Sequence, residues 1–148
     1  MKKTTKKVFA LLLVAIAIFS FASCKNEVPP EIPDNWLWEN ALYTEDTEFI
    51  NGEKHLGMMV TADGKTIVFN IYSDAETVGE ALIENGLVEG DDGQFGLYIK
   101  YVNGIKAVYE EDGAYWGFLD RDGNFMSTGV DMTELHDGDV YELRYIKE

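Results

Sequence analysis

TVGEALIENG, the stretch from Thr77 to Gly86, decides the fold because it carries the clearest helical pattern in the chain. Thr77 and Glu80 match the S/T-x-x-E capping box, in which a hydroxyl and a carboxylate each accept a backbone N–H where a helix begins. Asn85-Gly86 is typical of a helix end, because glycine adopts the left-handed conformation without strain. Apolar residues recur at the i, i+3, i+4 spacing of one helix face, at Val78, Ala81 and Leu82. The segment predicts one short helix with one buried face.

Short runs of strand character lie on both sides of this helix. Apolar residues alternate along Leu56–Val60 and again along Ile67–Ile71, and Asp63-Gly64 between them is typical of a tight hairpin. Further runs of this kind are Leu97–Val102, Ile105–Tyr109, Tyr115–Leu119 and Val140–Ile146. About six short strands and a single main helix predict an α+β domain, in which the helix covers one face of a mixed sheet. This order of elements is typical of a β-grasp-like fold.

The first 23 residues have the pattern of a secretory signal peptide. Val8–Phe19 are twelve uninterrupted apolar residues after a lysine-rich start, too few for the roughly 20 that a spanning helix needs. The residues FASC, at 21–24, resemble the lipobox of bacterial lipoproteins, in which small residues precede a cysteine whose thiol receives a diacylglycerol. Phe21 stands where that motif usually has leucine. The resemblance predicts a lipidated Cys24, and the alternative is ordinary cleavage that leaves Cys24 as a free thiol.

A composition change after Cys24 divides the rest of the chain. All three prolines lie in the short stretch before Trp36, which favours an extended tether over a packed segment. The predicted organisation is a signal peptide over residues 1–23, the lipidated cysteine and a Pro-containing tether over residues 24–35, and a folded domain over residues 36–148. We therefore expect the protein on the extracellular face of the bacterial cell membrane, held by its lipid anchor.

The charge and the cysteine content exclude several classes of partner and site. The formal net charge is −15, and four of the 12 basic residues but none of the 27 acidic ones precede Cys24, so the chain without its leader carries −19. That charge repels phosphate backbones, and nucleic acid is not expected as a partner. Because Cys24 is the single cysteine, neither an internal disulfide nor a cysteine-based metal site is expected.

The order of motifs resembles the transcobalamin-like C-terminal domain family. A lead-in, WENALYTEDTE, spans residues 38–48. The later motifs are SDAETVGEALIENGLVEG at 73–90, GLYIKYVNGI at 96–105, DGAYWGF at 112–118, STGVDMTEL at 127–135 and DGDVYELRY at 137–145. The resemblance covers roughly residues 38–148, and bacterial members of this family look like small surface lipoproteins.

This resemblance implies a β-grasp-like module and contact with a corrinoid ring. The corrinoid follows from the vertebrate cobalamin carriers, whose last domain is similar. Those carriers close over their ligand with a large helical domain, for which the roughly 125 residues after the leader leave no room. A lone module would have to bind its ligand on an open face.

The residue inventory does not favour an enzyme. An acyl-transfer site needs a nucleophile beside a positioned base. After Cys24 the chain offers only Ser73, Ser127, His55 and His136, without nucleophile-elbow spacing around either serine. We therefore predict no catalytic residue and no cofactor.

A calcium-like stretch, DRDGN at Asp120–Asn124, does not predict a metal site. An EF-hand needs glycine at the sixth position and glutamate at the twelfth, whereas Gly123 is fourth and Asp131 is twelfth. The stretch predicts a hairpin turn, and no metal ligand is predicted elsewhere.

Aromatic residues supply the candidate ligand contacts. Sixteen of the 19 follow the leader, and most must lie in the core. Tyr115 and Trp116 point to opposite faces of a strand, so one can pack under the helix while the other stays at the surface. Trp116 is the preferred contact, with Tyr115 and the turn around Gly129 completing the predicted ligand site. The alternative for Trp116 is a large core side chain.

The leading functional interpretation is a lipid-anchored extracellular, non-enzymatic module that binds a small ligand, such as a corrinoid, on an aromatic strand face. The alternative is a cell-surface protein–protein interaction module without a small-molecule ligand, in which an exposed strand edge recruits a partner chain.

Overall fold

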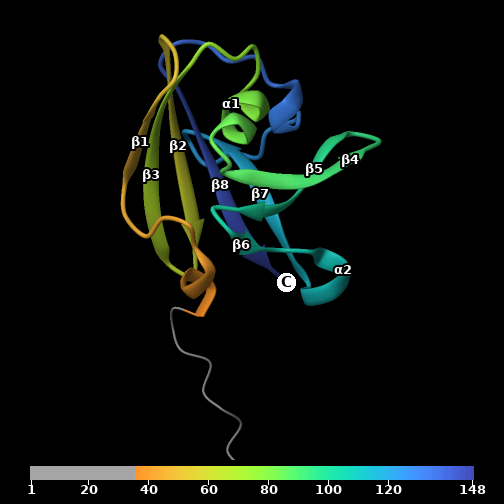
Figure 1. Cartoon of the computed structure of the whole chain (residues 1–148). Coiled ribbons are helices and arrows are strands. Elements are labelled where there is room, and N and C mark those ends of the chain that lie inside the picture. The colour runs from red at the N-terminus through yellow and green to blue at the C-terminus, as the bar shows by residue number, and fades with distance from the viewer. Residues whose placement is uncertain (1–35) are drawn as a thin grey trace, which may run out of the picture. The chain divides into compact units, whose positions relative to one another are not determined.

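A five-stranded and a three-stranded β-sheet form the domain that the computed structural model describes, residues 36–148 (Figure 1). These residues belong to one compact unit. The predicted signal peptide, the predicted lipidation at Cys24 and the predicted tether over residues 24–35 lie outside the described residues. Among the helices of residues 36–148, none is long and apolar enough to span a bilayer.

The larger sheet has the strand order β1-β3-β2-β8-β7. Its strands are β1 (Thr47–Ile50), β2 (Lys54–Ala62), β3 (Lys65–Ser73), β7 (Ala114–Asp120) and β8 (Asp139–Lys147). The β2–β3 and β7–β8 pairs are antiparallel, whereas β1–β3 and β2–β8 are parallel, so the sheet is mixed. Asp63 and Gly64 join β2 to β3 with φ of 51° and 74°, the positive values of a type I′ turn. The hairpin predicted there is confirmed.

The smaller sheet has the order β4-β5-β6. It consists of β4 (Val88–Gly93), β5 (Gly96–Val102) and β6 (Ile105–Lys106), all antiparallel. The helical elements are η1 (Trp36–Asn40), α1 (Val78–Glu84), α2 (Tyr109–Asp112) and η2 (Val130–Met132).

Helix α1 begins and ends as its sequence predicts. Thr77 is the N-cap of a complete capping box with Glu80, and Gly86 follows the helix with φ of 65°. Gly79 lets α1 approach η2 closely, because a Cβ at this position would lie 2.8 Å from the backbone nitrogen of Asp131.

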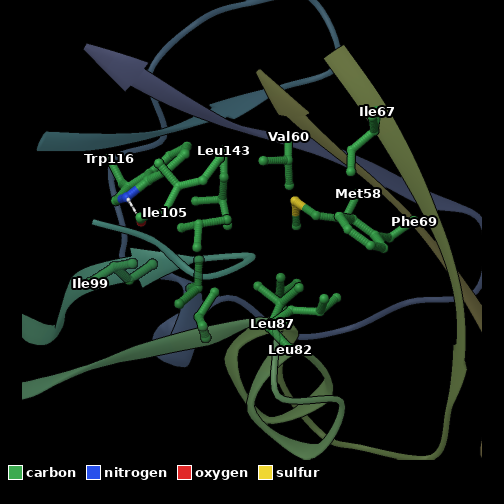
Figure 2. Close-up of a cluster of buried hydrophobic side chains, with 14 of the residues drawn as sticks. Met58, Val60, Ile67, Phe69, Leu82, Leu87, Ile99, Ile105, Trp116 and Leu143 are labelled. Atoms are coloured by element: carbon green, nitrogen blue, oxygen red, sulfur yellow. Dashed lines mark hydrogen bonds between the residues drawn. The ribbon is translucent and has the colours of Figure 1, made fainter. Parts of the chain in front are cut away.

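The core lies between the larger sheet and the elements that cover it. Figure 2 shows Met58, Val60, Phe69 and Leu143 extending from the larger sheet toward the space that Leu82 and Leu87 also enter. Ile99 and Ile105 of the smaller sheet belong to the same buried cluster. One core therefore joins α1 and both sheets.

The predicted fold class, a single mixed sheet covered by one main helix in a β-grasp-like α+β domain, is wrong. The described residues are mostly β and form two sheets. The physical reason is length, because the seven residues of α1 extend about 10 Å, whereas a nine-residue strand such as β2 extends about 30 Å. The smaller sheet covers much of the apolar face that the helix leaves open.

Two strands were not predicted, and one predicted strand is shorter than expected. Neither β1 nor β4 has the apolar alternation of a half-buried strand. The run predicted as a strand over Ile105–Tyr109 is β6 for only two residues, and Tyr109 begins α2.

Candidate functional site

A groove lies where β5, β7 and the segment before η2 come together. Its volume is about 180 Å³, below the 300–1,000 Å³ of pockets that enclose a drug-sized ligand. The lining residues are Leu97, Tyr98, Ile99, Tyr115, Trp116, Phe118, Gly129 and Val130. All three residues of the ligand site predicted from the sequence, Trp116, Tyr115 and Gly129, line this groove.

Trp116 is mainly a core residue that reaches the groove. Its side chain is 8% exposed, and its Nε1 donates a hydrogen bond to the carbonyl of Ile105 at 3.2 Å (Figure 2). Its ring meets Tyr145 edge to face, with 5.7 Å between centroids. These two contacts fix the indole in the core, so its role in ligand binding stays a prediction.

Tyr115 is half-buried, and a second tyrosine packs against it. The ring of Tyr109, in α2, lies 6.5 Å from that of Tyr115 at an angle of 64°. Tyr98 of β5 joins this group, because its hydroxyl accepts a hydrogen bond from the backbone N–H of Tyr109 at 3.4 Å. We call Tyr98, Tyr109 and Tyr115 the tyrosine cluster.

Two carboxylates contact the tyrosine cluster. The Tyr98 hydroxyl donates to Oε2 of Glu110, and the Tyr109 hydroxyl donates to Oε2 of Glu148, both at 3.4 Å. An O–H···O hydrogen bond is usually 2.7–2.8 Å long, so these contacts are weak. The carboxylate oxygens remain able to accept hydrogen bonds from a ligand.

A buried carboxylate oxygen without a donor lies beside Gly129, one of the residues that line the groove. Oδ1 of Asp131 is buried and has no hydrogen-bond partner among the described residues. Gly96 and Gly129 flank it, and a Cβ built on them would lie 2.6 Å and 2.9 Å from this oxygen. Gly129, which the sequence placed in the ligand site as part of a turn, thus leaves room for the Asp131 carboxylate. A buried oxygen without a donor costs about 1–3 kcal/mol.

The sequence did not indicate Tyr98, Tyr109, Phe118 or Asp131 as parts of this site. Tyr98 lies in the predicted strand Leu97–Val102, but the strand pattern does not show which other strand its ring meets. The packing of β5 against β7 and η2, and of α2 against β7, brings these side chains together.

The stretch Asp120–Asn124 is a turn, as its spacing predicted. The Asp120 carboxylate accepts hydrogen bonds from the backbone N–H groups of Asp122 and Asn124, both at 2.9 Å. The hydrogen bond from the Asn124 backbone is the largest cause that lowers the pKa of Asp120. Within residues 36–148, no group of three His, Cys, Asp or Glu side chains could hold a metal ion.

A second, larger hollow of about 570 Å³ lies between η1 and the β5–β6 hairpin. It contains two exposed apolar side chains, Trp36 at 41% and Leu42 at 60% exposure. The hollow contains none of the three residues predicted from the sequence. It supplies matched control positions for tests of the groove.

The fold and the groove define a small two-sheet domain with a shallow aromatic depression. Its solved relatives include a protein of Ruminococcus gnavus ATCC 29149, provisionally described as metal-binding, with 32% sequence identity and a TM-score of 0.60. The similarity covers 65% of this chain and 99% of that protein. This chain belongs to the same family as the R. gnavus protein, and its residues 75–147 match the domain of unknown function DUF4430.

A more distant likeness extends to haptocorrin. The structure of haptocorrin in complex with Cbi matches with a TM-score of 0.51 and 21% identity, over 66% of this chain and 26% of haptocorrin. This likeness supports the transcobalamin-like domain predicted from the sequence. It concerns the fold, and the chain spans about a quarter of haptocorrin. No curated protein sequence matches the chain.

Proposed function

We propose that the protein is a non-enzymatic binding module that holds part of a small ligand in the groove between β5 and β7. The observation that carries this proposal is the aromatic lining of the groove, to which Tyr98, Tyr115 and Phe118 contribute from two different sheets. Binding sites for small molecules are typically concave and mostly apolar, with a few polar groups that orient the ligand. The groove has this composition.

A corrinoid is the leading ligand. The support is the likeness in fold to haptocorrin, described in complex with Cbi, together with the aromatic lining of the groove. A volume of about 180 Å³ is too small for a macrocycle, so one edge or substituent would enter while the ring lies across the rim. Haptocorrin is about four times longer than the matched region, so a lone module is expected to bind more weakly.

The polar residues of the domain support a binding role over catalysis. Ser73 is fully buried, and its hydroxyl donates to Glu84 and accepts from the backbone of Ala75. His55 contacts Asn70, and His136 lies between Glu134 and Asp139. Within residues 36–148, these contacts place neither histidine beside a nucleophile.

The proposed location rests on the sequence pattern of the first 35 residues. Lipidation of Cys24 and a tether over residues 24–35 would hold the module on the extracellular face of the cell membrane, where a ligand from the medium can reach the groove.

A cell-surface protein–protein interaction module is the second candidate. Phe95, in the turn between β4 and β5, is 84% exposed, and Met132 in η2 is 63% exposed. Phe95 precedes Gly96, which lies close to the Asp131 carboxylate, and Met132 follows Asp131 in the chain. Exposed apolar side chains of this size are typical of interaction surfaces.

A thermal-shift screen of the purified chain tests the proposal. Corrinoids, haem, glycans and peptides are the ligand classes to compare, because a ligand that binds only the native state raises Tm by mass action. We expect a shift with a corrinoid that Tyr115→Ala reduces and Leu42→Ala, in the second hollow, preserves. A shift only with peptides, reduced by Phe95→Ser, would favour the interaction module.

A further inference from the structure

The larger sheet has two faces, and the layer that covers it lies on one of them. Figure 1 shows α1 and the smaller sheet on the same side of this sheet, where their buried side chains share its core. Residues that oppose each other on paired strands point to the same side of a sheet. Met59 therefore lies on the other side, together with its partners Val68 of β3 and Glu142 of β8. We call the side that carries Met59 the outer face.

The outer face exposes apolar surface from one edge of the sheet to the other. At its centre, Met59 opposes Val68, and both side chains are half-buried. Ile50 of β1 lies on the same face, because it opposes Tyr72, which alternates in phase with Val68. Ile50 is 72% exposed. At the β7 edge, Phe125 lies beside Gly117 and is 62% exposed.

A glycine in the central strand of this face has no explanation within the sheet. Gly57 opposes Asn70 on one side and Val140 on the other, without a bulge in either register. A Cβ at this position would meet Cγ2 of Val140 at 3.4 Å, which is ordinary contact, so the sheet has room for a methyl group. Glycine inside a strand weakens it and often marks the close approach of another backbone. Gly57 is therefore an indication, separate from the apolar surface, that another chain packs on the outer face.

The charge of the outer face favours a second copy of the chain over a basic partner. Glu48 and Glu142 are the acidic residues among its strand positions, and Glu142 is paired with Arg144. The face is thus nearly neutral, whereas the whole chain carries −15. A basic partner would gain more on the acidic rest of the surface, where two copies of this chain would repel each other.

The size of the outer face agrees with a stable dimer. Strands β2, β3 and β8 have nine residues each and extend about 30 Å, and the five strands of the sheet span about 24 Å at a spacing of about 4.8 Å. The product is about 700 Å² on each copy. Stable interfaces bury about 800 Å² per partner, so stacking over this whole face comes close to that area.

We propose that two copies of this chain pair through the outer face of the larger sheet and form a two-fold dimer. In such a dimer the same patch of each copy meets its equivalent, so a nearly neutral, partly apolar face meets another. The two sheets would stack about 10 Å apart, as in a β-sandwich. The inference goes beyond the proposed function and does not rest on it, because none of its arguments uses the groove.

Sedimentation equilibrium of the purified full chain, in density-matched detergent, measures the association. Wild type is run from low to high micromolar protein concentration, at low and at high salt. We expect a monomer–dimer equilibrium that shifts toward the dimer as salt is added, because salt screens the repulsion between two negatively charged copies. A chain that stays monomeric at every concentration, or a dimer that salt weakens, would overturn the inference.

Matched glutamate substitutions locate the contact. Ile50→Glu brings two like charges into the interface and should weaken the dimer at least about tenfold. Its control is Met132→Glu, which adds the same charge at a residue of similar exposure, 63% against 72%, in η2, which packs on α1. This control should dimerise like wild type. Met59→Glu places the charge at the centre of the face and should abolish the dimer.

The melting curve of each variant shows whether the monomer still folds. Ile50 is exposed, so Ile50→Glu should melt like wild type even if Met59→Glu lowers Tm. Equal dimerisation of Ile50→Glu and Met132→Glu would overturn the inference, because the contact would then lie outside the outer face, for example in the apolar run of the predicted leader.

Discussion

Replacement of Trp116 by alanine distinguishes a core tryptophan from a ligand platform. The structure favours the core, because the ring is 8% exposed and its Nε1 bonds the carbonyl of Ile105. Removing a large buried aromatic side chain costs about 3–5 kcal/mol of unfolding free energy. In a domain of this size, each kcal/mol corresponds to about 4–8 °C in Tm. We therefore expect Trp116→Ala to lower Tm by about 12 °C or more.

Trp36→Ala is the matched control for this experiment. Trp36 is 41% exposed and makes no hydrogen bond through Nε1 among the described contacts, so its removal should cost about 1 kcal/mol. Both variants are melted by circular dichroism, and urea unfolding gives the free energy. If Trp116→Ala lowered Tm no more than Trp36→Ala, the indole would not be part of the core, and the interpretation of β7 would be refuted.

Three further predictions concern packing, pH and location. Gly79→Ala should destabilise the domain by about 1–2 kcal/mol, although alanine favours helices, because the new Cβ would lie 2.8 Å from the Asp131 backbone. An increase in the urea concentration at the unfolding midpoint would contradict the close approach of α1 to η2. The pKa of Glu142 is lowered, and the largest cause is its pair of hydrogen bonds from Arg144 at 2.6 and 2.8 Å. The ionised Glu142 therefore contributes its full stabilisation of the fold above the pKa that this group has in the unfolded chain, and the contribution is lost as pH falls through its lower pKa in the folded protein. Glu142→Gln should therefore be less stable than wild type by about 1 kcal/mol near pH 7, and the two melting temperatures should converge once the pH falls below the lowered pKa of Glu142 in the folded protein. Cys24→Ala should move the protein from the membrane to the soluble fraction, and a variant that stays with the membrane would exclude the lipid anchor.

Local sequence signals predicted the elements that depend on neighbouring residues. The capping box of Thr77 and the hairpin at Asp63-Gly64 are set by a few adjacent residues, and both are confirmed. β4 carries the acidic sequence VEGDDG, which lacks strand character and pairs through its hairpin to β5. The parallel pairing of β2 with β8 joins residues far apart in the chain. Such pairings decide that there are two sheets, and no local pattern contains them.

The candidate site was predictable to a similar extent. Alternation along β7 showed that Tyr115 and Trp116 face opposite sides, and both line the groove. Tyr98 and Tyr109 were missed because their contacts with β7 depend on how the smaller sheet packs. The buried oxygen of Asp131 could not be predicted, because it depends on the absence of side chains at Gly96 and Gly129 together.

A calorimetric titration of a corrinoid into the purified chain tests the central claim most directly. Wild type, Tyr115→Ala and Leu42→Ala are compared, since Tyr115 lines the groove between β5 and β7 whereas Leu42 lines the second hollow. By analogy with stacking on aromatic side chains, Tyr115→Ala should weaken binding by about 1–3 kcal/mol, whereas Leu42→Ala should bind like wild type. Wild-type affinity in Tyr115→Ala, or a loss confined to Leu42→Ala, would contradict the placement of the ligand in this groove.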